Sequence, residues 1–235
     1  MKRKLITFIM ASLLSSSALA VDSGGNSVYI DQTNADNSTV SITQTGSNNQ
    51  VGDSADISSP SFVIDGNSMS LTIDQNGMNN SIIGNFIGGN STATLSQDGN
   101  SNTTNLNMGN MGTSSGTLNL SVTGDNNTTG LNIGTTNDAG NYNFLATITG
   151  GSNAMTNNIN SKNTTNAFTV TGSSNTITTT QIGANGTSQT GGHNIQTSII
   201  GSNNSLSVLQ NGTTNPNSVI LNVTGTGTST TITQH

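Results

Sequence analysis

The sequence has no cysteine, no tryptophan and no glutamate, and only two prolines, Pro60 and Pro216. Charged residues make up 6% of the 235 residues and aromatic residues 3%, far below their share in ordinary globular domains. Hydrophobic residues reach only 29%, so we expect no conventional thick core. The lack of cysteine excludes disulfides as a source of stability.

Gly, Ser, Thr and Asn are the most frequent residues, and such a composition is also typical of disordered chains. The scarcity of proline and of charge argues against disorder, and so does the alternation of β-branched and polar residues. In STVSITQTGSNN (38–49), for example, Val40 and Ile42 alternate with Ser and Thr before a Gly and a pair of Asn. Such alternation favours short strands separated by turns.

The first twenty residues are typical of a secretory signal peptide. Lys2, Arg3 and Lys4 precede an apolar run (5–14), and Ala18-Leu19-Ala20 provides a small-residue cleavage site. We expect cleavage after Ala20, because the apolar run is too short for a permanent transmembrane helix. No later stretch is apolar enough to be a transmembrane segment.

Removing this peptide leaves Lys162 as the one lysine against ten Asp, a net charge of −9 with His neutral. Nucleic-acid binding therefore loses its electrostatic basis.

A Gly-x-x-Asn pattern recurs along the chain with successive spacings of 22 to 31 residues. It occurs at Gly46/Asn49, Gly77/Asn80, Gly99/Asn102, Gly124/Asn127, Gly150/Asn153, Gly172/Asn175 and Gly201/Asn204. Each pair follows an alternating or β-branched run such as SITQT or FTVT, and a second short run such as SIIG (81–84) or SLSVLQNG (205–212) comes after it. Two strands per unit predict an all-β solenoid of about eight coils, each stacked on its neighbour.

A solenoid also accounts for the composition. Inward side chains of two facing sheets need only one small apolar residue at alternate positions, and Gln, Asn, Ser and Thr at equivalent positions can form hydrogen-bonded ladders. We expect Gly and Asn at the corners to provide the left-handed backbone angles of tight turns.

The pattern Ser38-x5-Gln44-x-Gly46-x-x-Asn49 and its repeat from Ser91 through Gln97 and Gly99 to Asn102 resemble the repeat of curlins, the subunits of curli amyloid fibres. A partial match runs from Gln75 through Gly77 to Asn80. From Gly124 onward the Gln position holds Val122, Ile148, Val170 and Ile199. The return strand of the curlin repeat, with its Ala and second Gln, is degenerate here.

The resemblance implies a signal peptide (1–20), a short Gly/Ser segment (21–26) and a curlin-like solenoid (27–235). It further implies a secreted fibre subunit that polymerises with itself, with a related subunit or nucleator as a further partner, after export by outer-membrane secretion machinery. Adhesion and biofilm matrix are the implied roles. A monomeric solenoid adhesin, or a minor component that nucleates or caps fibres, is the alternative.

An enzymatic role as a polysaccharide-acting β-helix is less favoured, because it needs a matched acid and base close together. His193, His235 and Lys162 are the bases of the mature chain, and Asp53 and Asp56 are the closest acid pair. His193 lies in a turn-like TGGHN segment and is expected to be a solvated loop residue. We expect no catalytic residue, no cofactor and no metal, since no calcium-binding nonapeptide is present.

Thr-rich runs such as TITTT (176–180) suggest ice binding as another alternative, but coil lengths differ by up to nine residues, which argues against a regular array. Assembly follows more directly from the fold, because each end coil of a solenoid presents a strand edge that templates addition. Asp65, Asp74, Asp98 and Asp125 are interpreted as gatekeepers against premature aggregation or as solubilising charges.

Overall fold

The computed structural model describes residues 5–12, 16–21, 24–53, 62–88, 90–108, 116–133, 142–160, 164–183, 192–212 and 217–235. These residues form strands and turns, and none of them forms a helix long and apolar enough to span a membrane.

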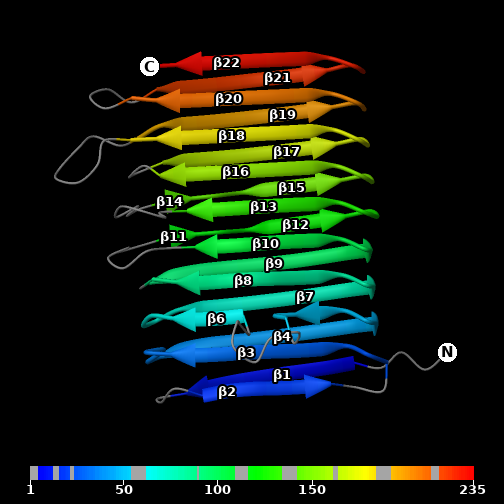
Figure 1. The fold of residues 1–235 in the computed structure, drawn as a ribbon, viewed down its shortest axis with the longest axis vertical. Helices are drawn as coiled ribbons and strands as arrows, with labels where there is room; N and C mark the ends of the chain where they lie inside the picture. Colours follow the sequence, from blue (N-terminus) through cyan, green and yellow to red (C-terminus); the bar gives the residue numbers. More distant parts are fainter. Residues whose placement is uncertain are drawn as a thin grey trace.

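The strands form two sheets, and within each sheet successive levels are parallel and in register (Figure 1). Sheet 1 consists of β4 (Ser38–Ser47), β7 (Ser70–Met78), β9 (Ser91–Asn100), β11 (Gly116–Thr117) with β12 (Leu120–Thr123), β14 (Tyr142–Asn143) with β15 (Ala146–Thr149), β17 (Thr165–Thr171), β19 (Asn194–Ile200) and β21 (Ser218–Thr224). Sheet 2 consists of β3 (Ser27–Thr33), β5 (Gln50–Val51) with β6 (Phe62–Asp65), β8 (Ser81–Ile87), β10 (Thr103–Met108), β13 (Thr128–Ile133), β16 (Ala154–Asn160), β18 (Thr176–Ile182), β20 (Ser205–Asn211) and β22 (Ser229–Gln234).

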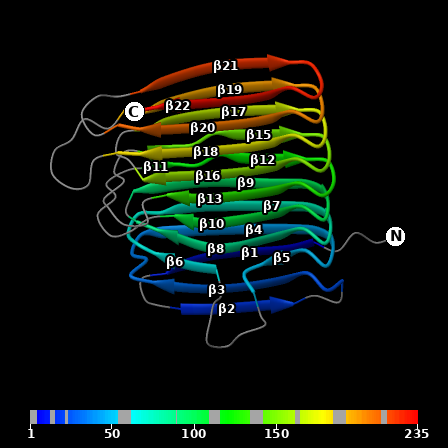
Figure 2. The ribbon, with the colours of Figure 1, turned by 45° about the horizontal axis from the view of Figure 1, so that its top comes forward.

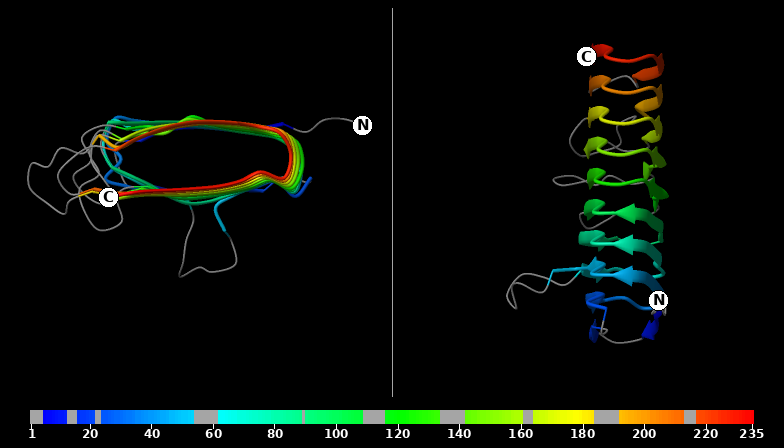
Figure 3. Two further views of the ribbon diagram at one scale, coloured as in Figure 1. Left: turned by 90° about the horizontal axis from the view of Figure 1, so that it is seen from above. Right: turned by 90° about the vertical axis from the view of Figure 1, so that its right-hand side faces the viewer.

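The chain alternates between the two sheets and climbs by one strand level per coil, which confirms the predicted β-solenoid. Sheet 1 has eight parallel levels, and therefore seven steps, whereas sheet 2 has nine levels. Seen along its axis, the solenoid is a flattened ring with two long sides (Figure 3). Strands of sheet 1 run opposite to those of sheet 2, as the arrows in Figures 1 and 2 show.

Two further strands lie at the N-terminal end of the stack. β1 (Leu5–Ser12) pairs with β4, and β2 (Ser16–Val21) pairs with β3, in both cases antiparallel. Both belong to the segment that the sequence predicts to be a signal peptide, except for Val21.

The core is a single layer between the sheets, filled by every second residue of each strand. Val40 and Ile42 of β4 are fully buried, and the same inward alternation continues in later strands. The core is less uniform than expected, because it also holds the fully buried rings of Phe62, Phe86 and Phe144. The Phe144 ring lies 5.8 Å from that of Phe168 one level on.

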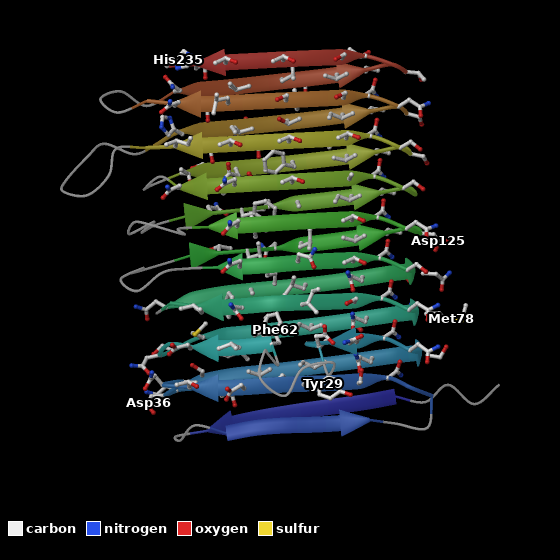
Figure 4. All side chains as sticks on the ribbon, viewed as in Figure 1. Tyr29, Asp36, Phe62, Met78, Asp125 and His235 are labelled. Carbon is white, nitrogen blue, oxygen red and sulfur yellow. The ribbon has the colours of Figure 1, made fainter. Side chains whose placement is uncertain are left out.

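Every turn from sheet 1 to sheet 2 is a Gly-x-x-Asn segment or its variant, and these turns stack along one edge of the solenoid. Figure 4 shows Met78 and Asp125 on this edge and Asp36 on the opposite one. Each turn requires Gly at its first position for two reasons, the positive φ and the close approach of the next level. A Cβ on Gly150 (φ +102°) would lie 2.1 Å from the carbonyl oxygen of Gly172 on the next level. No side chain fits there.

Candidate functional site: the asparagine and glutamine ladders and the open end

The Asn residues of the turns form a continuous amide ladder inside one edge of the solenoid. Oδ1 of Asn127, for example, accepts hydrogen bonds from the backbone N and from Nδ2 of Asn153, both at 3.0 Å. Nδ2 of Asn127 donates to the carbonyl oxygen of Gly150 at 2.8 Å. The same arrangement links all the predicted turn residues: Asn49, Asn80, Asn102, Asn127, Asn153, Asn175 and Asn204.

The backbone angles of these turns confirm that Gly and Asn at the corners adopt left-handed conformations, but the Asn concerned is not the ladder Asn. Positive φ occurs at the Gly and at the residue just before the ladder Asn, such as Asn48 (φ 55°) or Ser174 (φ 58°), and not at the ladder Asn itself. The ladder position therefore needs Asn for its amide, which is buried and bonded on both sides, and not for a left-handed backbone.

A Gln ladder lies beside it in sheet 1. Nε2 of Gln44 donates to Oε1 of Gln75 at 2.8 Å, and Nε2 of Gln75 donates to Oε1 of Gln97 at 2.9 Å. Each amide also donates across the core to a backbone carbonyl of sheet 2, as Gln44 does to Ser27 at 3.2 Å. The Gln residues thus join successive levels and also the two sheets. On the following levels Val122, Ile148, Val170 and Ile199 occupy the same register position.

A second Gln ladder, which the sequence reasoning missed, lies in sheet 2. Nε2 of Gln181 donates to Oε1 of Gln210 at 3.0 Å, and Nε2 of Gln210 donates to Oε1 of Gln234 at 3.1 Å. Gln32 occupies the same register column at the opposite end of the stack. The return strand therefore keeps its Gln at both ends of the solenoid, so its description as degenerate is wrong there.

The signal for this second ladder was an Asn-x5-Gln spacing, from Asn26 to Gln32 and again at 175–181 and 204–210. Asn26 also belongs to the Asn ladder, since its Oδ1 accepts from the backbone N of Asn49 at 2.9 Å. The last turn, Gly225-x-x-Thr228, replaces the Asn with Thr. The backbone N of Thr228 donates to Oδ1 of Asn204, and the Asn ladder stops at this level.

The predicted Ser positions mark the start of the sheet 1 strands. Ser38 is buried, its Oγ donates to the carbonyl oxygen of Gly66 at 3.1 Å, and the same Oγ accepts from the backbone N of Met69 at 3.0 Å. Ser91 begins β9, and its side chain lies outside the described part of the structure.

His193 is not a solvated loop residue, contrary to the expectation. Its side chain is only 1% exposed, because β19 begins at Asn194 and directs the preceding residue into the core. Its Nδ1 accepts a hydrogen bond from the backbone N of Asn217 at 3.1 Å. Burial lowers the pKa of His193 and outweighs the opposite effect of the carbonyls of Ile182 and Gly212.

The remaining charged residues do not converge on a site. Asp53, Asp74, Asp98, Asp125 and His235 are exposed, and Asp31 and Asp65 are half-buried. Asp56 and Lys162 lie outside the described residues. Within the described ranges no group of three or more His or Asp residues is placed to hold a metal ion.

The outer face of sheet 1 carries a short column of Thr hydroxyls in register despite the unequal coil lengths. Thr123, Thr149 and Thr171 lie in register on successive levels, because length differences fall in the connections from sheet 2 to sheet 1. Irregular coils are therefore no argument against an array. This column, however, is interrupted by Asp98 on one side and by Ile200, which is 51% exposed, on the other.

Within the described residues the last level of the solenoid is uncovered, and its surface is called the open end. β21 and β22 each pair with one strand on their inner side, and no described strand lies on their outer side. Leu221 and Ile232 are only partly buried there. At Gly225 an added Cβ would meet nothing closer than Thr228 Oγ1 at 3.8 Å, so the space that other turns fill with the next level is free.

This arrangement offers backbone edges and unfinished ladders, which are suited to pairing with another strand. None of the protein-family models, curated proteins or solved structures compared with the chain matches it.

Proposed function

We propose that the chain is the structural subunit of a curli-like extracellular amyloid fibre, secreted and assembled end to end, that serves adhesion and biofilm matrix. The open end carries the proposal. β21 and β22 present backbone donors and acceptors, partly exposed Leu221 and Ile232, and the terminal amide of the Gln234 ladder on one surface. A further copy of the solenoid would satisfy all three.

The ladders support the same function, because in-register Gln and Asn stacks add to the backbone pairing that holds cross-β fibres together. The outer surface is consistent with it as well. It is largely polar, and its few charges, nearly all Asp, are spread along the chain, so that salt at physiological ionic strength screens the repulsion between copies. The fibre would have the secretion machinery, and a related subunit or nucleator, as its further partners.

The test is assembly of purified residues 21–235 after removal of denaturant. We expect thioflavin-binding fibres with a cross-β reflection near about 4.7–4.8 Å. Ile232→Lys should block elongation, because it places an unpaired charge in the inward column of the open end. Thr231→Lys is the matched control, since Thr231 is the exposed neighbour on the same strand.

A chain that stays monomeric for days at tens of micromolar would contradict the fibre proposal. That result would favour the alternative, a monomeric solenoid adhesin or a minor component that nucleates or caps fibres. Adding the monomer to fibres of a related subunit would then separate a cap from an adhesin.

A further inference from the structure

The outermost parallel strands at both ends of the solenoid belong to the same sheet. β3 is the first and β22 the last, and both lie in sheet 2, which has nine levels against eight in sheet 1. From β3 to β22 the chain therefore passes through an odd number of strand positions, nine in sheet 2 and eight in sheet 1. A chain that continued this path beyond β22 would next occupy a position in sheet 1, on top of β21.

A second copy can be added to this end in two ways. Simple translation along the axis places its β3 on β22 and leaves one strand position empty between β21 and the second copy's β4. The two strands bordering that gap would keep unpaired N–H and C=O groups inside the fibre. A half-turn about the solenoid axis instead places β3 of the second copy on β21 and its β4 on β22, which fills every position.

The half-turn also keeps all pairings parallel, because the two sheets run in opposite directions and the rotation exchanges them. We propose that successive subunits in the fibre are related by a half-turn about the axis, with β4 of each copy docked on β22 of the one before. This proposal rests on the fibre function proposed above and specifies its contact surface.

Both geometries continue the Gln234 ladder, but translation adds only Gln32 before the column passes to Ile64, whereas the half-turn adds three Gln residues. Gln234 lies six residues after Thr228, which takes the place of the ladder Asn just before β22, and Gln44 lies six residues after the buried Ser38 at the start of β4. The two Gln residues therefore occupy equivalent places in their strands. With β4 on β22, the ladder of Gln181, Gln210 and Gln234 continues into the second copy. The continuous column then holds six amides: Gln181, Gln210, Gln234 and the second copy's Gln44, Gln75 and Gln97.

The apolar residues of the open end are covered by the same arrangement. With Gln44 above Gln234, Ile42 of the second copy lies on Ile232, two residues earlier in each strand. On the other sheet, Ile30 of the second copy lies on Leu221. Both residues of the open end are partly exposed in the single chain, whereas Ile30 and Ile42 are inward-facing core residues. At both contacts an apolar side chain of the second copy therefore covers an apolar side chain of the open end.

The end of the Asn ladder at Thr228 distinguishes the half-turn from simple translation. Translation would bring Asn26 of the second copy onto Thr228, which has no amide to continue the ladder. The half-turn instead brings the 34–37 connection of the second copy to that corner and places its Asn26 at the opposite edge. Replacement of Asn by Thr at 228 is therefore expected of a ladder that ends within each subunit.

Cleavage of the predicted signal peptide would expose the other surface of the junction, the outer edges of β3 and β4. In the described chain the outer edges of β3 and β4 are covered by β2 and β1. Cleavage after Ala20 would remove both strands apart from Val21, and would leave the edges that this junction uses.

Engineered cysteine pairs test the junction, because the chain has no cysteine of its own. The half-turn places the outward Thr233 of one copy beside Thr43 of the next, whereas translation places it beside Asp31. In-register neighbours on adjacent strands are about 4.8 Å apart, within the range that a disulfide bridges. Within one chain these positions lie at opposite ends of the solenoid, so every disulfide reports a contact between subunits.

Fibres of residues 21–235 carrying Thr43→Cys and Thr233→Cys should yield a ladder of covalent oligomers after oxidation and complete denaturation. Fibres carrying Asp31→Cys and Thr233→Cys should yield monomers. The reverse result, or fibres in which neither pair links, would overturn the half-turn and leave the fibre function standing. A mature chain that forms no fibres at all would overturn both.

Electron microscopy of unmodified fibres gives a second measurement that does not depend on the cysteine variants. The half-turn predicts a true axial repeat of two subunits, about 82 Å at ~4.8 Å per level, with the edge that carries the Gly-x-x-Asn turns alternating between the two sides. A repeat of one subunit with that edge always on the same side would contradict it.

Discussion

Nε2 of Gln44 lies 2.8 Å from Oε1 of Gln75, although 31 residues separate the two in the chain. Gln75 makes the same contact with Gln97 over a separation of 22 residues. The contact is thus independent of coil length, because each amide is fixed by strand register and not by the connection that precedes it.

Replacing Gln44, Gln75 and Gln97 together with Glu should prevent folding and assembly. Three carboxylates would lie buried, one strand spacing apart, with no base to pair with them. Thioflavin kinetics and circular dichroism at pH 7.5 would measure the loss.

The matched control places the same stack of charges outside. Thr43, Asp74 and Ser96 are in-register neighbours on the outer face of the same three strands. Thr43→Glu with Ser96→Glu should therefore create a column of three outward-facing carboxylates and still assemble. Equal inhibition by both variants would show that net charge, and not the buried ladder, limits assembly.

Asn127→Ala should destabilise the chain by about 2–3 kcal/mol, because it leaves the backbone N and Nδ2 of Asn153 without their acceptor in a buried place. Urea unfolding of the soluble chain would measure this. Asn105→Ala, at an exposed outward position of β10, is the control and should change the free energy of unfolding by less than about 0.5 kcal/mol. Similar losses of unfolding free energy at both positions would mean that a ladder Asn contributes no more to stability than an exposed Asn.

Gly150→Ala should be far more damaging than Gly225→Ala. Both residues have positive φ, but a Cβ on Gly150 collides with the carbonyl of Gly172, whereas Gly225 has open space above it. We expect Gly225→Ala to fold as a monomer and to lose elongation, because a second copy needs that space. Normal elongation by Gly225→Ala would contradict end docking at this corner.

Stability should fall as the pH is lowered from about 7 towards 5, in part through His193. Burial holds the pKa of His193 in the folded chain below its ordinary value of about 6.5, so the unfolded chain binds a proton first. The destabilisation begins near pH 6.5 and grows until the folded-state pKa is reached. Urea unfolding at a series of pH values would show the slope. His193→Gln should remove it above the range where Asp titrates, and His235→Gln, at an exposed position, should not.

The sequence by itself determined the kind of fold. The recurring Gly-x-x-Asn turns and the alternation around Val40 and Ile42 predict short strands and tight corners, and their 22–31-residue spacing predicts stacked coils. These are local properties, because backbone angles and side-chain direction are set within a few residues. The equivalence of Val122, Ile148, Val170 and Ile199 with the Gln column followed from the same spacing.

Tertiary structure decided what each residue does. Connections of unequal length precede the sheet 1 strands, so the burial of His193 just before β19 follows only from register between levels. The Asn-x5-Gln spacing marks the Gln of the sheet 2 strands, but the column that joins Gln32 to Gln181 across levels without Gln follows only from strand pairing. The Asn of each turn was correctly located, yet its role as an amide ladder depends on a neighbour one coil away. Which sheet holds the outermost strands depends on the number of strands in the whole stack. Hydrogen bonding between levels, and not local sequence, decides this number.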